Sequence, residues 1–217
     1  ALLQGGGSHW SDRKPLCPPE AMIYRRNGKE VESLPDDFYS SRYYTDRILE
    51  WIEQGRGDDK PFFAYLSYTA PHDPLHAPED YIAKYRGKYD RGWDVLRQQR
   101  LEGLKRLGMV PDDATPFPRL PNVKAWDDMS EEERALAARD MEVYAAMVDS
   151  MDQAIGKILA AIDARGIARN SFVLFMSDNG GAAYASGGAN NAPYRGGKGE
   201  TFEGGIRVVA LMRWPAR

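Results

Sequence analysis

Cysteine and histidine are scarce in this chain, and long apolar runs are absent. Among its 217 residues there is one cysteine, Cys17, so an internal disulfide framework is excluded. Cys17 has no Cys or His neighbour at ligand spacing, which argues against a zinc site. No run of about 18 apolar residues occurs, so the sequence predicts no membrane span.

An excess of one charge sign is also missing. The chain carries 29 Lys and Arg against 32 Asp and Glu, a formal net charge of -3, and both signs are scattered along it. This distribution offers no basic face for nucleic acid. The length is sufficient for one domain with a sizeable core.

The most informative stretch runs from Phe172 to Arg207. Phe172–Met176 is a short apolar run that stops at Ser-Asp-Asn-Gly-Gly, a pattern typical of a buried parallel strand entering a loop. Ligands of open α/β sheets lie beyond the carboxyl ends of the strands, so Asp178 and Asn179 are candidate oxygen ligands for a hard cation. Taken alone, however, Asp-Asn-Gly is most often only a turn.

A lysine follows in a glycine-rich loop. Lys198 stands 19 residues after Asn179, among Gly196, Gly197 and Gly199, where little side-chain bulk would keep a ligand away. Strand end, oxygen ligands, glycine loop and lysine together suggest a metal-assisted anion site.

Helical periodicity is clearest over Ser130–Arg165. Ser130 and Glu133 form a capping-box pattern, and Gly166 ends the segment. The apolar residues that repeat at helical spacing are Tyr144, Met147, Val148, Met151, Ile155, Ile158, Leu159 and Ile162. Further helices are predicted from Tyr39 to about Gly55 and over Asp94–Leu107.

Strands are predicted over Pro61–Tyr68, Phe172–Met176 and Ile206–Trp214. Asn27-Gly28 indicates a type I′ hairpin turn. The order of helix, Gly166 and strand predicts an α/β fold with a mostly parallel sheet flanked by helices.

His72 is the second candidate site. It follows the predicted strand Pro61–Tyr68 and stands between Pro71 and Pro74, which limits its backbone freedom. Such a histidine suits contact with an anion or a leaving oxygen in fixed geometry, and the alternative is a loop histidine that caps a backbone carbonyl. His76 has weaker support, and His9 is left outside the site. On this fold, His72 and Asp178 would face the same rim of one sheet.

The charged, proline-interrupted segment of residues 81–121 is interpreted as an excursion over the mouth of the site. Insertions of this kind usually decide which substrate enters. Its basic residues are expected to be a solvated face.

Two stretches resemble one family. The run S-D-N-G-G followed by P-Y-R-G-G-K-G-E-T-F-E-G-G-I-R-V, and the segment KPFFAYLSYTAPHDPLHAP over Lys60–Pro78, resemble the sulfatases, specifically the bacterial arylsulfatase branch of the alkaline phosphatase superfamily. The resemblance implies that Asp178 and Asn179 match the later pair of calcium ligands. It further implies that Lys198 and His72 match catalytic residues that contact the sulfate or its leaving oxygen, and that either supplies a proton to the departing group.

Other parts of the family pattern are missing. The nucleophile of sulfatases is a formylglycine made within a C/S-x-P-x-R motif, and no such motif occurs; Cys17 is followed by Pro-Pro-Glu-Ala. The early paired aspartates of the calcium shell and the smaller C-terminal subdomain are absent too. Residues 1–217 are therefore interpreted as a partial sulfatase catalytic domain, incomplete at both ends and nearly inactive by itself.

The resulting hypothesis is an intact parent protein that cleaves small-molecule or glycan sulfate monoesters with calcium. One alternative is a phosphonate or phosphate ester hydrolase of the same superfamily, although its two-metal members need more ligands than His9, His72 and His76 supply. Another is a non-catalytic scaffold with the same fold. The sequence leaves the particular ester, the localisation and the oligomeric state open.

Overall fold

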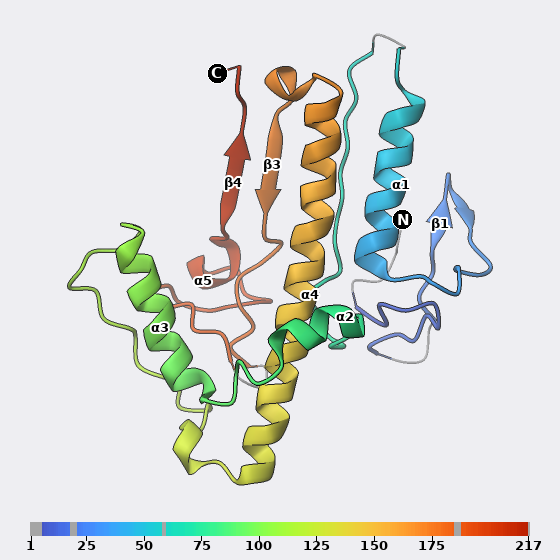
Figure 1. Ribbon diagram of the computed structural model, residues 1–217. Helices are drawn as coiled ribbons and strands as arrows, with labels where there is room; N and C mark the ends of the chain where they lie inside the picture. The colour runs from blue at the N-terminus through green and yellow to red at the C-terminus, as the bar shows by residue number, and fades with distance from the viewer. Residues whose placement is uncertain (1–5, 18–20, 58–59, 185–187, 217) are drawn as a thin grey trace. The chain divides into compact units, whose positions relative to one another are not determined.

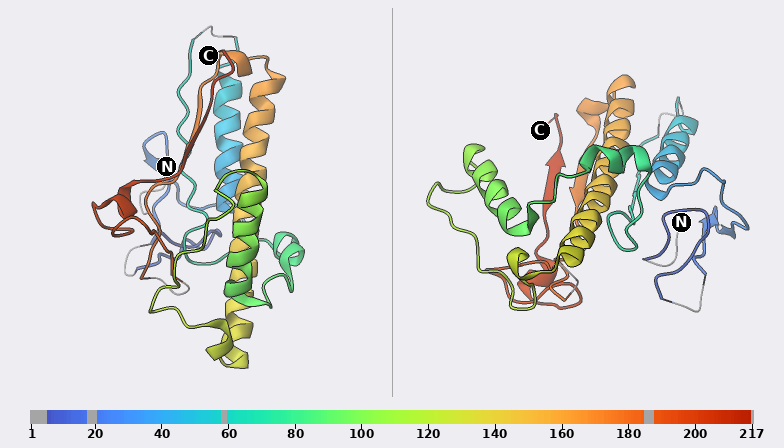
Figure 2. Two further views of the ribbon diagram at one scale, coloured as in Figure 1. Left: turned by 90° about the vertical axis from the view of Figure 1, so that its left-hand side faces the viewer. Right: turned by 60° about the horizontal axis from the view of Figure 1, so that its bottom comes forward.

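The computed structural model describes residues 6–17, 21–57, 60–184 and 188–216 (Figures 1 and 2). The chain divides into two compact units. The first unit comprises Ala1–Gly87 and Arg139–Ile167, and the second comprises Lys88–Ala138 and Ala168–Arg217. The elements, in chain order, are β1 (Arg25–Arg26), β2 (Lys29–Glu30), α1 (Ser40–Gln54), α2 (Glu79–Ile82), η1 (Ala83–Tyr85), α3 (Gly92–Arg106), η2 (Trp126–Asp128), α4 (Glu131–Ala164), η3 (Ala168–Asn170), β3 (Val173–Met176), α5 (Glu203–Ile206) and β4 (Ala210–Arg213).

In the first unit, α1 and the later part of α4 run side by side (Figures 1 and 2). The helix predicted after Tyr39 is confirmed as α1, which buries Ile48 and Ile52. At the end of α4, the Arg165 guanidinium donates to the Ile52 carbonyl over 2.7 Å and pairs with the Glu53 carboxylate. The two helix ends are thus held together by a charged group that satisfies an unpaired helix-terminal carbonyl.

The long helix is confirmed, but its buried face was only partly predicted. Tyr144 and Val148 are 40% and 37% exposed. The buried positions instead follow a spacing of four through smaller and polar residues: Ala138, Glu142, Ala146, Ser150 and Ala154, with Met147 and Ile162. The other six predicted residues are buried or half-buried, so the periodicity located this face of the helix but missed its small and polar members, which large apolar residues do not reveal.

The capping box at the start of α4 is confirmed. The Ser130 N–H donates to Glu133 Oε2 over 2.9 Å, and the Glu133 N–H donates to Ser130 Oγ over 3.1 Å. The hairpin prediction is confirmed as well, because Asn27 and Gly28 join β1 to β2 with φ of 51° and 81°. Positive φ at both central residues is the requirement of a type I′ turn.

The prediction of a mostly parallel sheet is wrong for the residues that the structure describes. These contain two antiparallel pairs, β1 with β2 and β3 with β4, and no parallel pair. Parallel strands need a crossover of a dozen or more residues, usually a helix. The helix between β3 and β4 is the four-residue α5, and the chain returns antiparallel.

The strand predicted over residues 61–68 is also wrong within the described part of the chain. The segment has no regular secondary structure, and Phe63 and Tyr65 are 91% and 78% exposed. An apolar run favours a strand, but a strand forms only where another strand accepts its backbone hydrogen bonds. The Tyr68 hydroxyl does reach α1, 2.7 Å from Thr45 Oγ1.

In the second unit, the helix predicted over Asp94–Leu107 is confirmed as α3. The Asp94 carboxylate accepts from the Arg119 guanidinium over 2.8 Å and from the Trp126 N–H over 3.0 Å. Trp126 packs edge-on against Trp93, with ring centroids 5.0 Å apart. The helical part of the excursion is therefore anchored to the segment that follows it, through the Asp94 carboxylate and the contact between the two tryptophan rings.

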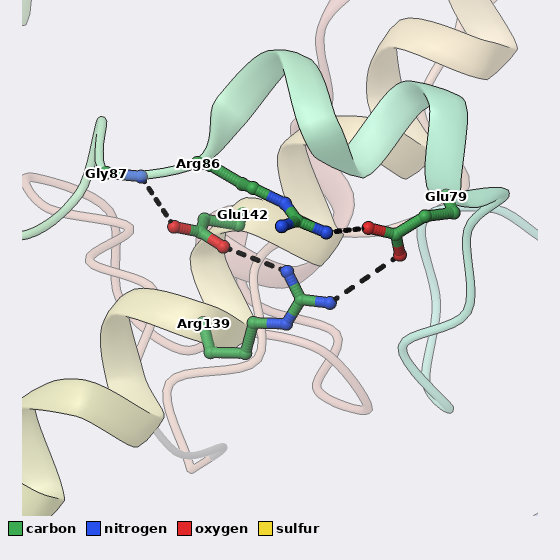
Figure 3. Close-up of polar contacts among 5 residues, drawn as sticks. All are labelled: Glu79, Arg86, Gly87, Arg139 and Glu142. Atoms are coloured by element: carbon green, nitrogen blue, oxygen red, sulfur yellow. Dashed lines mark hydrogen bonds and ion pairs between the residues drawn. The ribbon is translucent and has the colours of Figure 1, made fainter.

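A buried carboxylate binds the backbone at Gly87, the last residue of the first unit before the chain enters the second. Glu142 of α4 is 7% exposed; its Oε1 accepts from the Gly87 N–H over 2.8 Å and its Oε2 from Arg139 over 3.0 Å (Figure 3). Arg139 and Arg86 both also pair with Glu79, at the start of α2. The turn after η1 is thereby held on α4 by charge-assisted hydrogen bonds.

We expect Glu142→Ala to destabilise the protein more than Glu132→Ala, an exposed position on the same helix. Removing the buried carboxylate breaks its hydrogen bonds to the Gly87 N–H and to the Arg139 guanidinium, at a cost of about 2 kcal/mol. Thermal unfolding should show a melting temperature lower by about 4–8 °C for Glu142→Ala, with little change for the control. Equal melting temperatures would show that the network contributes nothing.

Candidate functional site

His72 lies in a tight turn of the first unit. The His72 N–H donates to the Thr69 carbonyl over 3.0 Å, and the peptide bonds before Pro71 and Pro74 are cis. The His72 ring is half-buried, and its Nδ1 donates to the Asp73 carbonyl over 2.9 Å. The turn therefore fixes both the backbone and the ring of this predicted site residue.

His9, which sequence analysis left outside the site, supports that turn from beneath. It is 1% exposed, its Nε2 is 3.1 Å from the His72 carbonyl, and its Nδ1 is 2.7 Å from Ser40 Oγ at the start of α1. A carbonyl only accepts, so Nε2 carries the proton and Nδ1 of the neutral ring accepts from Ser40. The Ser40 N–H donates in turn to the His9 carbonyl over 3.0 Å.

Burial lowers the pKa of His9 below its ordinary value of 6.5, against the opposing effect of the bond to the His72 carbonyl. The pKa of His76 is lowered as well, again chiefly by burial, with Asp12 opposing it. His76 Nδ1 is positioned to accept the His9 N–H, 3.4 Å away. The neutral form of both rings suits these contacts, so His76 has a place in supporting the turn.

The Asp178–Asn179 loop begins in the second unit where β3 ends. The Asp178 side chain is exposed, and its Oδ1 accepts the Asn179 N–H over 2.9 Å. The Asn179 amide donates to the Gly180 carbonyl over 2.8 Å, and the Gly180 N–H donates to the Gly205 carbonyl over 2.8 Å. The loop thus has the local Asx contacts of a turn, and backbone contacts hold it against α5.

Lys198 lies beside this loop through its backbone. The Lys198 N–H donates to the Gly181 carbonyl over 3.1 Å, two residues beyond Asn179. A Cβ on Gly197 would meet the same carbonyl at 2.6 Å, and a Cβ on Gly180 would collide with the Gly204 carbonyl. The glycines therefore allow two stretches of backbone to touch, and this brings three of the four predicted site residues into one region.

The oxygen donors fit a hard cation only in part. Asp178 supplies a carboxylate and Asn179 an amide oxygen, both suited to calcium, which takes 6–8 oxygen ligands. Within residues 6–17, 21–57, 60–184 and 188–216, no three His, Cys, Asp or Glu side chains are grouped so as to hold a metal ion. Two donors are a fraction of a calcium shell.

His72 belongs to the first unit, and Asp178, Asn179 and Lys198 belong to the second. The prediction that His72 and Asp178 face one rim stays a prediction. The role of all four residues likewise rests so far on the sequence.

Two supporting residues escaped the sequence analysis. His9 carried no local pattern, and its part depends on contacts with residues 31 and 63 positions away. Asn191 stands in the glycine-rich stretch and bonds the backbone of the loop after Asn179. The only sequence signal for Asn191 is that it is a polar residue in a segment composed mostly of glycine and alanine.

Residues 6–217 match the model of the Sulfatase family. An uncharacterized sulfatase of Schizosaccharomyces pombe is 36% identical over 99% of this chain and 46% of its own length. An arylsulfatase of Klebsiella aerogenes is 41% identical over 83% of this chain and 39% of its own length. The chain thus spans less than half the length of these curated relatives.

Solved structures agree in fold. The crystal structure of Ps i-CgsB in complex with k-i-k-neocarrahexaose has a TM-score of 0.53 and 30% identity, over 87% of this chain and 30% of that one. The yidJ protein of Bacteroides fragilis has the same TM-score of 0.53 at 20% identity, over 86% of this chain and 34% of that one. None of the helices in the described residues combines the length and apolar character of a membrane span.

The lowered pKa of His9 predicts a stability that falls in mild acid. Above the ordinary value of 6.5 the neutral ring is present in both the folded and unfolded states. As the pH falls from there toward the lower folded value, the unfolded state binds a proton that the folded state refuses, so stability is lost.

We expect His9→Gln to lose less stability than the unsubstituted protein between about pH 7.5 and pH 5.5, because one such group has been removed. Glutamine retains an amide that can donate to the His72 carbonyl. Urea unfolding at both pH values measures the difference. An identical loss in the two proteins would mean that His9 does not titrate on unfolding.

Proposed function

We propose a function on the premise that the chain belongs to the sulfatase family. The protein that contains it is a sulfuric ester hydrolase of arylsulfatase type, which cleaves small-molecule or glycan sulfate monoesters. The observation that supports this proposal is the contact between the Asp178–Asn179 loop and the Lys198 backbone through Gly181. This contact supports the proposal because it joins the backbone of Lys198 to the loop that carries the two oxygen donors.

In this proposal, Lys198 and His72 are the catalytic residues of the chain. Both would bind the sulfate, and a positive charge or hydrogen-bond donor there stabilises the charge that develops as the S–O bond breaks. Either group can give a proton to the departing alkoxide or phenoxide. The turn that fixes His72 from both sides, through Asp73 and His9, suits a residue that must meet a leaving oxygen in one geometry.

Asp178 and Asn179 would hold the calcium ion, together with ligands from outside this set. When bound, the ion would supply positive charge against the sulfate oxygens. The Asn179 side-chain amide donates its N–H to the Gly180 carbonyl, so the Oδ1 atom of the same amide points away from that carbonyl. The Asn179 oxygen is therefore oriented by the backbone before any ion binds.

The excursion over residues 81–121 would border the substrate entrance. Within the second unit, the Asn190 amide donates to the Pro118 carbonyl over 2.9 Å. Asn122 lies just beyond the excursion and donates to the Ala183 carbonyl over 3.1 Å. These contacts join the excursion to the loop that follows Asn179, where its side chains would influence which ester binds.

The formylglycine nucleophile that the family uses has no counterpart in these 217 residues, since no C/S-x-P-x-R motif occurs. We therefore assign the activity to the whole protein. The 217-residue chain by itself is expected to be nearly inactive and to bind calcium weakly.

The test of the reaction is hydrolysis of a chromogenic aryl sulfate by the whole protein. We expect Lys198→Ala and His72→Ala each to lower kcat/KM by about 10²-fold or more, since each removes a group that acts in the transition state. Lys157→Ala, an exposed lysine on α4, is the matched control and should retain full activity. Activity toward phosphate or phosphonate esters in place of sulfates would move the substrate class, and no hydrolysis at all would favour a scaffold.

The metal assignment has its own test. We expect calcium titration calorimetry on the whole protein to show affinity lowered by about 10-fold or more in Asp178→Ala and Asn179→Ala, because each removes one of a limited set of oxygen ligands. Asp152→Ala, exposed on α4, serves as the control. Unchanged affinity in both variants would place the ion elsewhere, as would tight binding by the 217-residue chain alone.

A further inference from the structure

We propose that Asn191 is a positioning residue, which holds Lys198 beside the Asp178–Asn179 loop. The inference rests on the proposed function, because it concerns the same sulfate site. Asn191 acts through the backbone on either side of it and is not itself assigned contact with substrate.

The Asn191 amide makes three hydrogen bonds to backbone. Its Oδ1 accepts from the Gly181 N–H over 2.9 Å, and its Nδ2 donates to the Gly181 carbonyl over 2.9 Å. The same Nδ2 donates to the Gly196 carbonyl over 3.2 Å. A planar amide that pairs with both polar groups of one residue imitates a neighbouring strand, so the side chain fixes the orientation of Gly181 as well as its distance.

These contacts lie symmetrically about the predicted site. Gly181 comes two residues after Asn179, and Gly196 comes two residues before Lys198. The Gly181 carbonyl that accepts from Asn191 also accepts from the Lys198 N–H over 3.1 Å. One side chain thereby joins the loop with the oxygen donors to the loop with the lysine.

The Asn191 side-chain amide is closely packed against the neighbouring glycines. A Cβ on Gly197 would meet Asn191 Nδ2 at 2.9 Å, and a Cβ on Gly181 would meet Asn191 Oδ1 at 3.0 Å and collide with the Ala189 side chain. Such close packing ties the separation of the two loops to the size of this side chain.

The neighbouring Asn190 shows what an ordinary loop asparagine does here. It is exposed, its Oδ1 accepts the nearby Ala192 N–H over 3.0 Å, and its Nδ2 donates to the Pro118 carbonyl. Among the described residues its side chain makes no hydrogen bond to Gly181 or Gly196. Asn190 is therefore a matched control of the same residue type, one position away.

Positioning matters for a lysine because its ammonium is a point charge on a flexible four-carbon stem. Where that stem begins decides whether the charge reaches the developing negative charge. A displacement of about 1 Å in a catalytic arrangement can cost on the order of 10²-fold in rate.

The test is a double-mutant cycle in the whole protein, with kcat/KM toward an aryl sulfate as the measurement. We expect Asn191→Ala to lower activity by about 10-fold or more, and Lys198→Ala to cost less than about 10-fold once Asn191 is gone, against about 10² in its presence. In the Asn190→Ala background, Lys198→Ala should still cost the full 10²-fold or so. Additive losses for Asn191 and Lys198 would overturn the proposal.

Asn191→Asp separates shape from hydrogen bonding. Aspartate has the same size but presents a carboxylate oxygen to the Gly181 and Gly196 carbonyls in place of the donor, so we expect it to be impaired as strongly as Asn191→Ala. This variant also serves if the alanine protein fails to fold. An aspartate variant with full activity would contradict the role of the Nδ2 donor.

Amide hydrogen exchange tests the same idea without reference to activity. Peptides that cover Gly181 and Lys198 should exchange at least about tenfold faster in Asn191→Asp than in the unsubstituted protein. Their exchange rates should be unchanged in Asn190→Ala. If the whole protein hydrolyses no sulfate, the proposed function fails, and exchange still decides whether Asn191 joins the loops. Unchanged exchange in the Asn191 variants overturns the inference even in an active sulfatase.

Discussion

Hydrogen bonds from side chains to backbone are the interaction on which the candidate site depends. The four candidate residues stand in loops, where no long ladder or helix satisfies the backbone polar groups. His9 supplies the donor for the His72 carbonyl, and Asn191 supplies both partners for Gly181. Loops stabilised in this way can hold a residue in one geometry and still vary in sequence elsewhere.

The same solution recurs outside the site. Glu142, on the buried face of α4, accepts the Gly87 N–H, and Arg165 donates to the Ile52 carbonyl in the last turn of α1. In the first case a charged group satisfies the backbone of an irregular connection, and in the second it satisfies a carbonyl at the end of a helix. The helix therefore acts as the frame of the first unit through polar contacts as much as through the small apolar cluster around Met147.

In the second unit, the absence of side chains at glycines is as important as the side-chain contacts. Gly180, Gly197 and Gly204 have backbone atoms where a Cβ of any other residue would stand. Removing side chains lets the loop after β3 touch the segment around Lys198 directly, and Asn191 then fills the space that remains. Large side chains are absent where a ligand is expected to approach. The Asn191 side chain maintains the separation of the two loops.

The sequence by itself determined the local features and the family. The capping box of α4 and the turn at Asn27 depend on neighbouring residues only, the helices α1 and α3 were predicted from local periodicity, and two long motif matches identified the sulfatase resemblance. Tertiary structure decided the rest. Strand partners, the exposed state of Phe63 and the parts of His9 and Asn191 depend on contacts between distant residues, which neither periodicity nor composition can specify.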